Sequence, residues 1–216
     1  MGGVEEMQAG PLVRRAIAWS AAERVKPGEA ASGDRYVVVA RPGCAWIAVI
    51  DGLGHGAEAA WAAGQAAGGV EGHTEQSLEA LARRCHEALR STRGAVIGFA
   101  AFREGADDME WLGIGNIQGV VHTSRGSAYV PSRTLLARSG IVGYTLPPML
   151  VSRVPLTPND LIVLATDGIR TDFADCLTRG APGRELADHI LSEYGRDSDD
   201  ALVLVIRYLG REQHER

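Results

Sequence analysis

The stretch Cys44-Ala-Trp-Ile-Ala-Val-Ile-Asp51-Gly-Leu-Gly-His-Gly56 decides how we expect this chain to fold. Residues 44–50 are apolar or small without a break, which predicts a strand buried on both faces. The strand ends at one carboxylate, Asp51, and the glycines that follow let the backbone turn sharply and approach a ligand closely. An acid held in this way at the edge of a sheet can bind a cation or face a phosphate.

The same pattern occurs at two other places in the chain. Leu161-Ile-Val-Leu-Ala-Thr-Asp167-Gly168 is a second apolar run that ends in Asp-Gly, and Asp199-Asp200 stands directly before the apolar run 201–208. A single Asp-Gly pair is often only a turn. Acids at the ends of three apolar strands are harder to explain as solubility, and they favour a shared function.

A hairpin is predicted around the turn Arg41-Pro42-Gly43. Residues 36–40 form a strand before this turn and residues 44–50 form the strand after it. Antiparallel pairing of the two strands would place Asp34, at the start of the first, beside Asp51, at the end of the second.

The other expected elements come in groups and not in regular alternation. Helices are expected over 57–70, 77–90 (with Thr74 as its cap) and 183–194. Strands are expected over 12–20, 95–102, 109–115, 118–122, near 128, 134–136, 149–154, 161–166 and 201–208. A doubly wound parallel sheet needs strand and helix to alternate throughout. The order therefore favours an α+β fold of antiparallel sheets flanked by helices, as a single domain over 1–216 with a frayed tail from 210.

Composition excludes several classes of protein. The chain has 216 residues, 45% of them hydrophobic and 23% charged, with a net charge of −5. These are values of a globular domain without the basic surface of a nucleic-acid binder. No apolar run reaches the about 20 residues that cross a bilayer. Three distant cysteines predict buried free thiols: Cys44, Cys85 and Cys176. We expect a cytoplasmic monomer without nucleic-acid or membrane partners, whose core includes Trp46, Trp61 and Trp111.

The candidate site consists of carboxylates: Asp34, Asp51, Asp167, Asp199 and Asp200. All are hard oxygen donors, and no Cys or His stands at ligand spacing, which favours Mn²⁺ or Mg²⁺ over Zn²⁺. Two such ions about 3.5–4 Å apart can share a carboxylate, activate water and bind a phosphoryl oxygen.

Three of the motifs quoted above (residues 50–56, 165–168 and 198–200), with Gly33-Asp34, resemble those of metal-dependent Ser/Thr phosphatases of the PP2C superfamily. The closest resemblance is to the bacterial SpoIIE-like branch, and the stand-alone size resembles a feedback phosphatase of the stressosome. The motifs follow the family's order over nearly the whole chain. The resemblance implies an α-β-β-α sandwich with two Mn²⁺ or Mg²⁺ ions between the sheets.

The resemblance also implies a role for each acid. Asp51 would bridge the metals and the Gly52 carbonyl would bind one of them. Asp167 and Asp199 would hold the other metal, and Asp34 would act directly or through a water. Water activated by the metals would attack phosphoserine or phosphothreonine in line, without a covalent enzyme intermediate.

This sequence departs from the family pattern at several positions. Leu53 stands where better-known relatives carry a histidine, so His55 would either protonate the leaving alkoxide or only stabilise the turn. The last motif lacks the hydroxyl residue that often follows the acids, which leaves open whether Asp199 or Asp200 is the direct ligand. The turn Gly113-Ile-Gly-Asn116 is too short for a nucleotide-binding loop but could line the substrate cleft. The arginine that binds phosphate in some relatives has three weak candidates: Arg14, Arg15 and Arg35.

Two other functions compete with this one. A haloacid-dehalogenase phosphatase needs a nucleophilic carboxylate two residues before the second acid of its motif, and Val49 occupies that position. A catalytically inactive binding module has no need for several mutually repelling carboxylates. The resemblance implies phosphorylated STAS-domain proteins of a stressosome as substrates, dephosphorylated as negative feedback in a stress response. A phosphorylated anti-anti-sigma factor is the alternative.

Overall fold

The predicted hairpin forms the centre of the fold. The computed structural model describes residues 16–74, 77–123, 132–177 and 183–210. Strand β2 (Asp34–Arg41) pairs antiparallel with β3 (Cys44–Gly52), with Arg41 opposite Cys44 and Asp34 opposite Asp51. Strand β4 (Ala95–Arg103) pairs with the other side of β3, so that β3 is covered along both edges. The expected approach of Asp34 to Asp51 is thereby confirmed.

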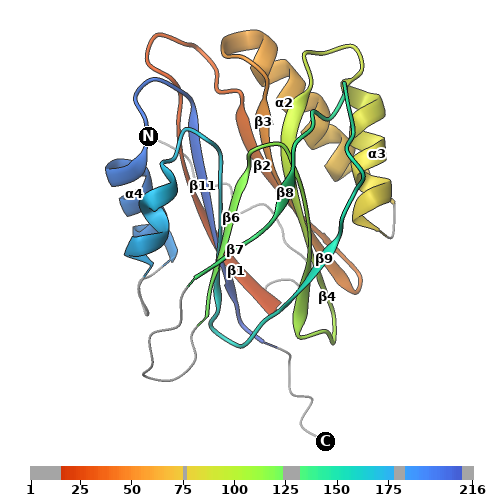
Figure 1. Ribbon diagram of the computed structural model, residues 1–216, viewed down its shortest axis with the longest axis vertical. Helices are drawn as coiled ribbons and strands as arrows, with labels where there is room; N and C mark the ends of the chain where they lie inside the picture. Colours follow the sequence, from red (N-terminus) through yellow and green to blue (C-terminus); the bar gives the residue numbers. More distant parts are fainter. Residues whose placement is uncertain (1–15, 75–76, 124–131, 178–182, 211–216) are drawn as a thin grey trace, which may run out of the picture.

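The strands form two sheets, one of which contains this hairpin (Figure 1). One has the order β2-β3-β4-β5-β8, with β9 also pairing with β5, and the other has the order β1-β11-β10-β6-β7. The remaining strands are β1 (Ile17–Arg24), β5 (Asp108–Ile114), β6 (Gln118–His122), β7 (Arg133–Thr134), β8 (Ala137–Arg138), β9 (Ser152–Pro155), β10 (Leu161–Ala165) and β11 (Ala201–Tyr208). The strand pairs are antiparallel, except that β5 and β8 run parallel.

Helices cover the outer face of each sheet. Helices α2 (Gly56–Glu71) and α3 (Leu78–Leu89) lie on the right in Figure 1, against the sheet of β3. Helix α4 (Gly183–Tyr194) and the 3₁₀ helix η1 (Thr171–Cys176) lie on the left, against the sheet of β11. One hydrophobic cluster fills the space between the sheets and one fills the space under each helical layer. The expected α-β-β-α sandwich is confirmed.

Strand β3 shows how the layers are specified. Trp46, Ala48 and Ile50 face the helices, whereas Ala45, Ile47 and Val49 face the other sheet. Successive side chains of a strand point to opposite faces, so Asp51 continues the inward series. Its carboxylate therefore belongs to the end of the space between the two sheets.

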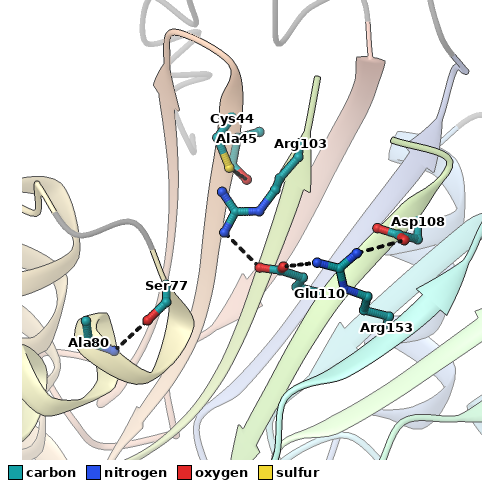
Figure 2. A network of polar contacts seen from close by, with 8 residues as sticks. All are labelled: Cys44, Ala45, Ser77, Ala80, Arg103, Asp108, Glu110 and Arg153. Carbon is teal, nitrogen blue, oxygen red and sulfur yellow. Dashed lines mark hydrogen bonds and ion pairs between the residues drawn. The ribbon is translucent and has the colours of Figure 1, made fainter. Parts of the chain in front are cut away.

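Several element boundaries differ from the expectations. The first strand spans 17–24 and not 12–20, of which residues 12–15 lie outside the described part. The cap of α3 is Ser77 and not Thr74, because the Ser77 hydroxyl accepts a hydrogen bond from the Ala80 amide at 3.3 Å (Figure 2). The expected strand at 134–136 is two short strands in different sheets, β7 and β8. The strand near 128 and the tail beyond 210 lie outside the described residues.

The expectation that Trp61 is in the core is wrong, because half of Trp61 is exposed, whereas Trp46 and Trp111 are buried. Helix α2 is so rich in alanine that its apolar pattern does not reveal which face is buried; alanines at 59, 62, 63, 66 and 67 take the buried face instead. The thiols are free; Cys44 and Cys85 are buried and Cys176 is partly buried. Across the described residues, no helix is both long and apolar enough to cross a membrane.

Candidate metal centre

Acids from both sheets meet at one end of the sandwich. Asp34 begins β2 and lies opposite Asp51 at the end of β3. In the other sheet, Asp167 follows β10 and Asp200 immediately precedes β11, the antiparallel neighbour of β10. A hydrogen bond links the two sheets here, because the hydroxyl of buried Thr166 donates to Oδ2 of Asp34 at 2.6 Å.

The charges of these acids act on one another. The pKa of Asp51 is raised to about 8, mainly by burial and in addition by the charges of Asp34, Asp167, Asp199 and Asp200. The pKa of Asp34 is raised to about 7. Burial is the main cause, the Thr166 hydrogen bond opposes the rise, and the charges of Asp200, Asp167 and Asp199 add to it. Carboxylates that repel one another in a buried place hold protons or cations more strongly than exposed ones do.

The donor set suits Mn²⁺ or Mg²⁺, since every acid offers hard oxygen atoms and carboxylates dominate the site. Among the described residues, no three Asp, Glu, His or Cys side chains are placed closely enough to hold a metal ion as they stand. Protein donors hold the carboxylates instead: besides Thr166 on Asp34, the Asn116 amide donates to Oδ2 of Asp167 at 2.8 Å. Binding an ion therefore requires side-chain rotations, for which exposed Asp167 has room.

Two glycines of the motifs are required by close packing. A Cβ atom at Gly52 would overlap the carbonyl of Ala59 in the first turns of α2. A Cβ atom at Gly168 would overlap the carbonyl of Asp200. These contacts seat both Asp-Gly turns tightly against neighbouring backbone, which fixes where the preceding carboxylates begin.

The neighbours Asp199 and Asp200 have different surroundings. Asp200 is 4% exposed, and its two oxygens accept hydrogen bonds from the backbone amides of Lys26, at 2.8 Å, and Gly33, at 2.7 Å. Asp199 is half-buried, and its one described hydrogen bond is the 3.0 Å contact that its Oδ1 accepts from the Asp200 amide. Asp199 thus keeps more of its carboxylate available for a metal ion.

His55 is the residue immediately before α2, and its side chain does not cap the helix. Its Nδ1 lies 2.6 Å from Oε1 of Glu29, and more than half of the side chain is exposed. The carboxylate of Glu29 fixes which ring nitrogen carries the proton when the imidazole is neutral. That leaves Nε2 as the atom that could exchange a proton with a substrate.

Of the three arginines proposed from the sequence, the structure describes Arg35 alone and does not place it at the acids. Arg35 is exposed, and the alternation of β2 turns it to the face opposite Asp34; Arg14 and Arg15 lie outside the described residues. Arg93, which sequence reasoning missed, lies against the turn at Gly54 and forms an ion pair with Glu58. No pattern in the sequence pointed to it, because it belongs to a loop far from Asp51 along the chain.

Thr166 and Asn116 were also not assigned their roles from the sequence. Thr166 stands beside Asp167 in a motif that drew attention to the acid alone. The turn that contains Asn116 was expected to be able to line the cleft, and its contact with Asp167 places it at the acids.

Comparisons with known proteins agree with this geometry. Residues 41–209 match the family described as Stage II sporulation protein E (SpoIIE). Phosphoserine phosphatase RsbX of Bacillus subtilis (strain 168) is 23% identical over 185 residues, which are 85% of this chain and 90% of RsbX. A crystal structure of RsbX in complex with magnesium has a TM-score of 0.79 at 21% identity and covers 89% of this chain and 96% of that one.

A further solved structure is more similar in sequence. It is described as "The bacterial stressosome: a modular system that has been adapted to control secondary messenger signaling". Its matching chain is 32% identical, with a TM-score of 0.79, over 88% of this chain and 99% of that one. The matched family spans most of the sequence and includes the motifs at Asp51, Asp167 and Asp199. This chain therefore belongs to the SpoIIE family of PP2C-type serine/threonine phosphatases.

Proposed function

We propose that this chain releases phosphate from phosphoserine or phosphothreonine in a protein, in a reaction that depends on Mn²⁺ or Mg²⁺. The observation that carries the proposal is the convergence of acids from two sheets, where burial and mutual repulsion raise the pKa of Asp51 to about 8. Such a cluster is stabilised by divalent cations, and bound cations of this kind activate water and neutralise charge on a phosphoryl group.

The residues would divide the work as follows. Asp51, Asp167 and Asp199, with the Gly52 carbonyl, would hold the ions, and Asp34 would hold one of them directly or through a water. Asn116 and Thr166 orient Asp167 and Asp34 by hydrogen bonds. As an imidazolium, His55 would give the Nε2 proton to the serine or threonine oxygen as the bond to phosphorus breaks, and would be left as the neutral ring whose Nδ1–H donates to Glu29.

We further propose STAS-domain proteins of a stressosome as the substrates, with dephosphorylation acting as negative feedback. Support comes from the likeness to RsbX and to the structure described as a bacterial stressosome. A phosphorylated anti-anti-sigma factor is the second candidate, since the same site could accept either protein. Measuring kcat/KM for the two phosphoproteins, assayed at equal concentrations, would distinguish these candidates. The physiological substrate should have a kcat/KM higher by about 10-fold or more, which corresponds to about 1.4 kcal/mol of transition-state binding.

The test of the reaction is phosphate release from these phosphoproteins with Mn²⁺, with EDTA and with Asp51→Asn. Asp197→Asn is the matched control, because Asp197 lies close to Asp199 in sequence but is exposed and paired with Arg24. Activity should require the ion and Asp51 and should survive the control substitution. Turnover that survives both EDTA and Asp51→Asn would refute the mechanism, and Mn²⁺ binding without turnover in the wild-type chain would instead favour an inactive binding module.

A further inference from the structure

The carboxylate of Asp200 accepts hydrogen bonds from both ends of the segment that connects β1 to β2. This connection, residues 25–33, leaves the second sheet after Arg24 and enters the first sheet at Asp34. Oδ1 of Asp200 accepts the Lys26 amide near the beginning of the connection, and Oδ2 accepts the Gly33 amide at its end. Asp200 thus binds both ends of the connection from the start of β11.

The end held at Gly33 is in direct contact with the candidate metal centre. The Gly33 carbonyl accepts a hydrogen bond from the Gly52 amide at 2.9 Å, and Asp34 is the next residue along the chain. Gly33 is so closely packed that a Cβ atom there would lie 2.7 Å from the Cβ of Ala59 and 3.2 Å from the Gly52 oxygen. A displacement of Gly33 would therefore move Asp34 and the Gly52 carbonyl together.

We propose that Asp200 is a positioning residue, which holds Gly33 in place while its neighbour Asp199 serves as the metal ligand that the proposed function assigns. This inference rests on the proposed function for the identity of the ligands. Asp200 is nearly fully buried, and both of its oxygens accept backbone N–H groups. Hydrogen bonds of this charge-assisted kind are about twice as strong as neutral ones, so they hold Gly33 where Asp34 and Gly52 need it.

Amide hydrogen exchange in the metal-free protein tests the contact itself. Asp200→Asn preserves the size of the side chain but presents an NH₂ group to one of the two amides, which leaves that amide unpaired. Exchange should accelerate by about 10-fold or more at the amide that is left unpaired, Lys26 or Gly33, while amides of β10 remain protected. Asp199→Asn, its matched neighbour, should leave exchange at Lys26 and Gly33 unchanged.

Mn²⁺ titration calorimetry tests the positioning, at a temperature where both variants are folded. Asp199→Asn should remove measurable binding at one ion site, and Asp200→Asn should weaken binding by about 10- to 100-fold, the effect typical of residues that orient metal ligands. Unchanged Mn²⁺ affinity in Asp200→Asn would overturn the positioning role. Loss of binding with unchanged exchange at Lys26 and Gly33 would make Asp200 a ligand and would also overturn it.

If Asp200→Asn does not fold, the wild-type chain still decides the first step. Long-range NMR correlations across hydrogen bonds should connect the amides of Lys26 and Gly33 to the side-chain carboxyl carbon of Asp200, and their absence would refute the contact. Asp200→Glu, which keeps the charge but displaces it, should then show the weakened Mn²⁺ binding, and wild-type affinity in that variant would overturn the proposal. Exchange and Mn²⁺ binding require no turnover, so a chain without phosphatase activity would contradict the proposed function alone.

Discussion

Two nearly buried carboxylates at different places in the sheet of β3 have opposite surroundings. Glu110 of β5 lies between two arginines, 2.9 Å from Arg103 and 3.4 Å from Arg153 (Figure 2). Asp34, which is buried to a similar extent, faces Thr166 and the charges of other aspartates. Burial does not explain this contrast between the surroundings of Glu110 and Asp34, because both side chains are less than 10% exposed.

The difference separates a structural use of buried charge from a functional one. Around Glu110 the charges are compensated, and the hydrogen bond to Glu110 raises the pKa of Arg103 further above its ordinary value. The Arg103 guanidinium also lies 5.5 Å from the ring centroid of Trp46. Around Asp34 and Asp51 the compensation is absent from the side chains described, so the fold tolerates repulsion that a divalent cation would relieve.

The largest effect is expected from Asp51→Asn. The substitution removes a ligand that the two ions are proposed to share. Loss of a residue that only orients a metal ligand can lower activity by about 100-fold. Loss of the ligand itself should therefore lower Mn²⁺-dependent phosphate release by more than this. The metal-free variant should be at least as stable as the wild-type chain at pH 8, because one repelling charge is gone. Thermal unfolding in EDTA beside activity in Mn²⁺ measures both, and a clear loss of stability would break the contrast with Glu110.

His55, which is paired with Glu29, tests the chemistry proposed for the end of the sandwich where the aspartates lie. His55→Gln should lower kcat on a phosphoserine protein by about 100-fold, the lower range for general acid catalysis. Activity on p-nitrophenyl phosphate should change little, because that leaving group needs no proton. Equal losses on both substrates would assign His55 to stabilising the turn.

At the arginine-rich end, Glu110→Gln should change stability and not catalysis. Arg103 and Arg153 would lose their shared partner, and since both are partly exposed we expect a loss of about 1–2 kcal/mol in the free energy of unfolding. This corresponds to a fall in Tm of about 2–8 °C for a chain of this size. Calorimetry measures the change in stability. A kcat/KM within about twofold of the wild type would support a structural role for Glu110 that is separate from the catalytic role of the aspartates.

A dependence of stability on pH is also expected in the metal-free protein. Asp51 and Asp34 have pKa values raised to about 8 and about 7, from 3.8 in the ordinary state. Between about pH 4 and about pH 8 the folded chain therefore holds more protons than the unfolded chain. The stability of the folded chain should be greatest near pH 4 and should fall as the pH rises towards 8. Urea unfolding across this range should show the decline, and Asp51→Asn or added Mn²⁺ should flatten it. A stability that rises with pH in the metal-free wild type would contradict the repulsion inferred here.

The sequence by itself determined the elements whose signal is local. The apolar run at 44–50, the turn after it and the preceding strand were enough to pair Asp34 with Asp51, because strand period and hairpin geometry leave little freedom. The motifs in order were enough for the family. Where the local signal was uniform it failed: an alanine-rich helix has no distinct apolar face, so Trp61 was misplaced.

The tertiary structure decided which donor meets which acid. Thr166 reaches Asp34 across 132 residues and Gly33 reaches Asp200 across 167, and no local pattern records such partners. The two members of Asp199-Asp200 are alike in sequence, yet one is enclosed by backbone amides and the other is not. Their roles differ because packing places each carboxylate separately, whereas the sequence specifies only that two acids precede a buried strand.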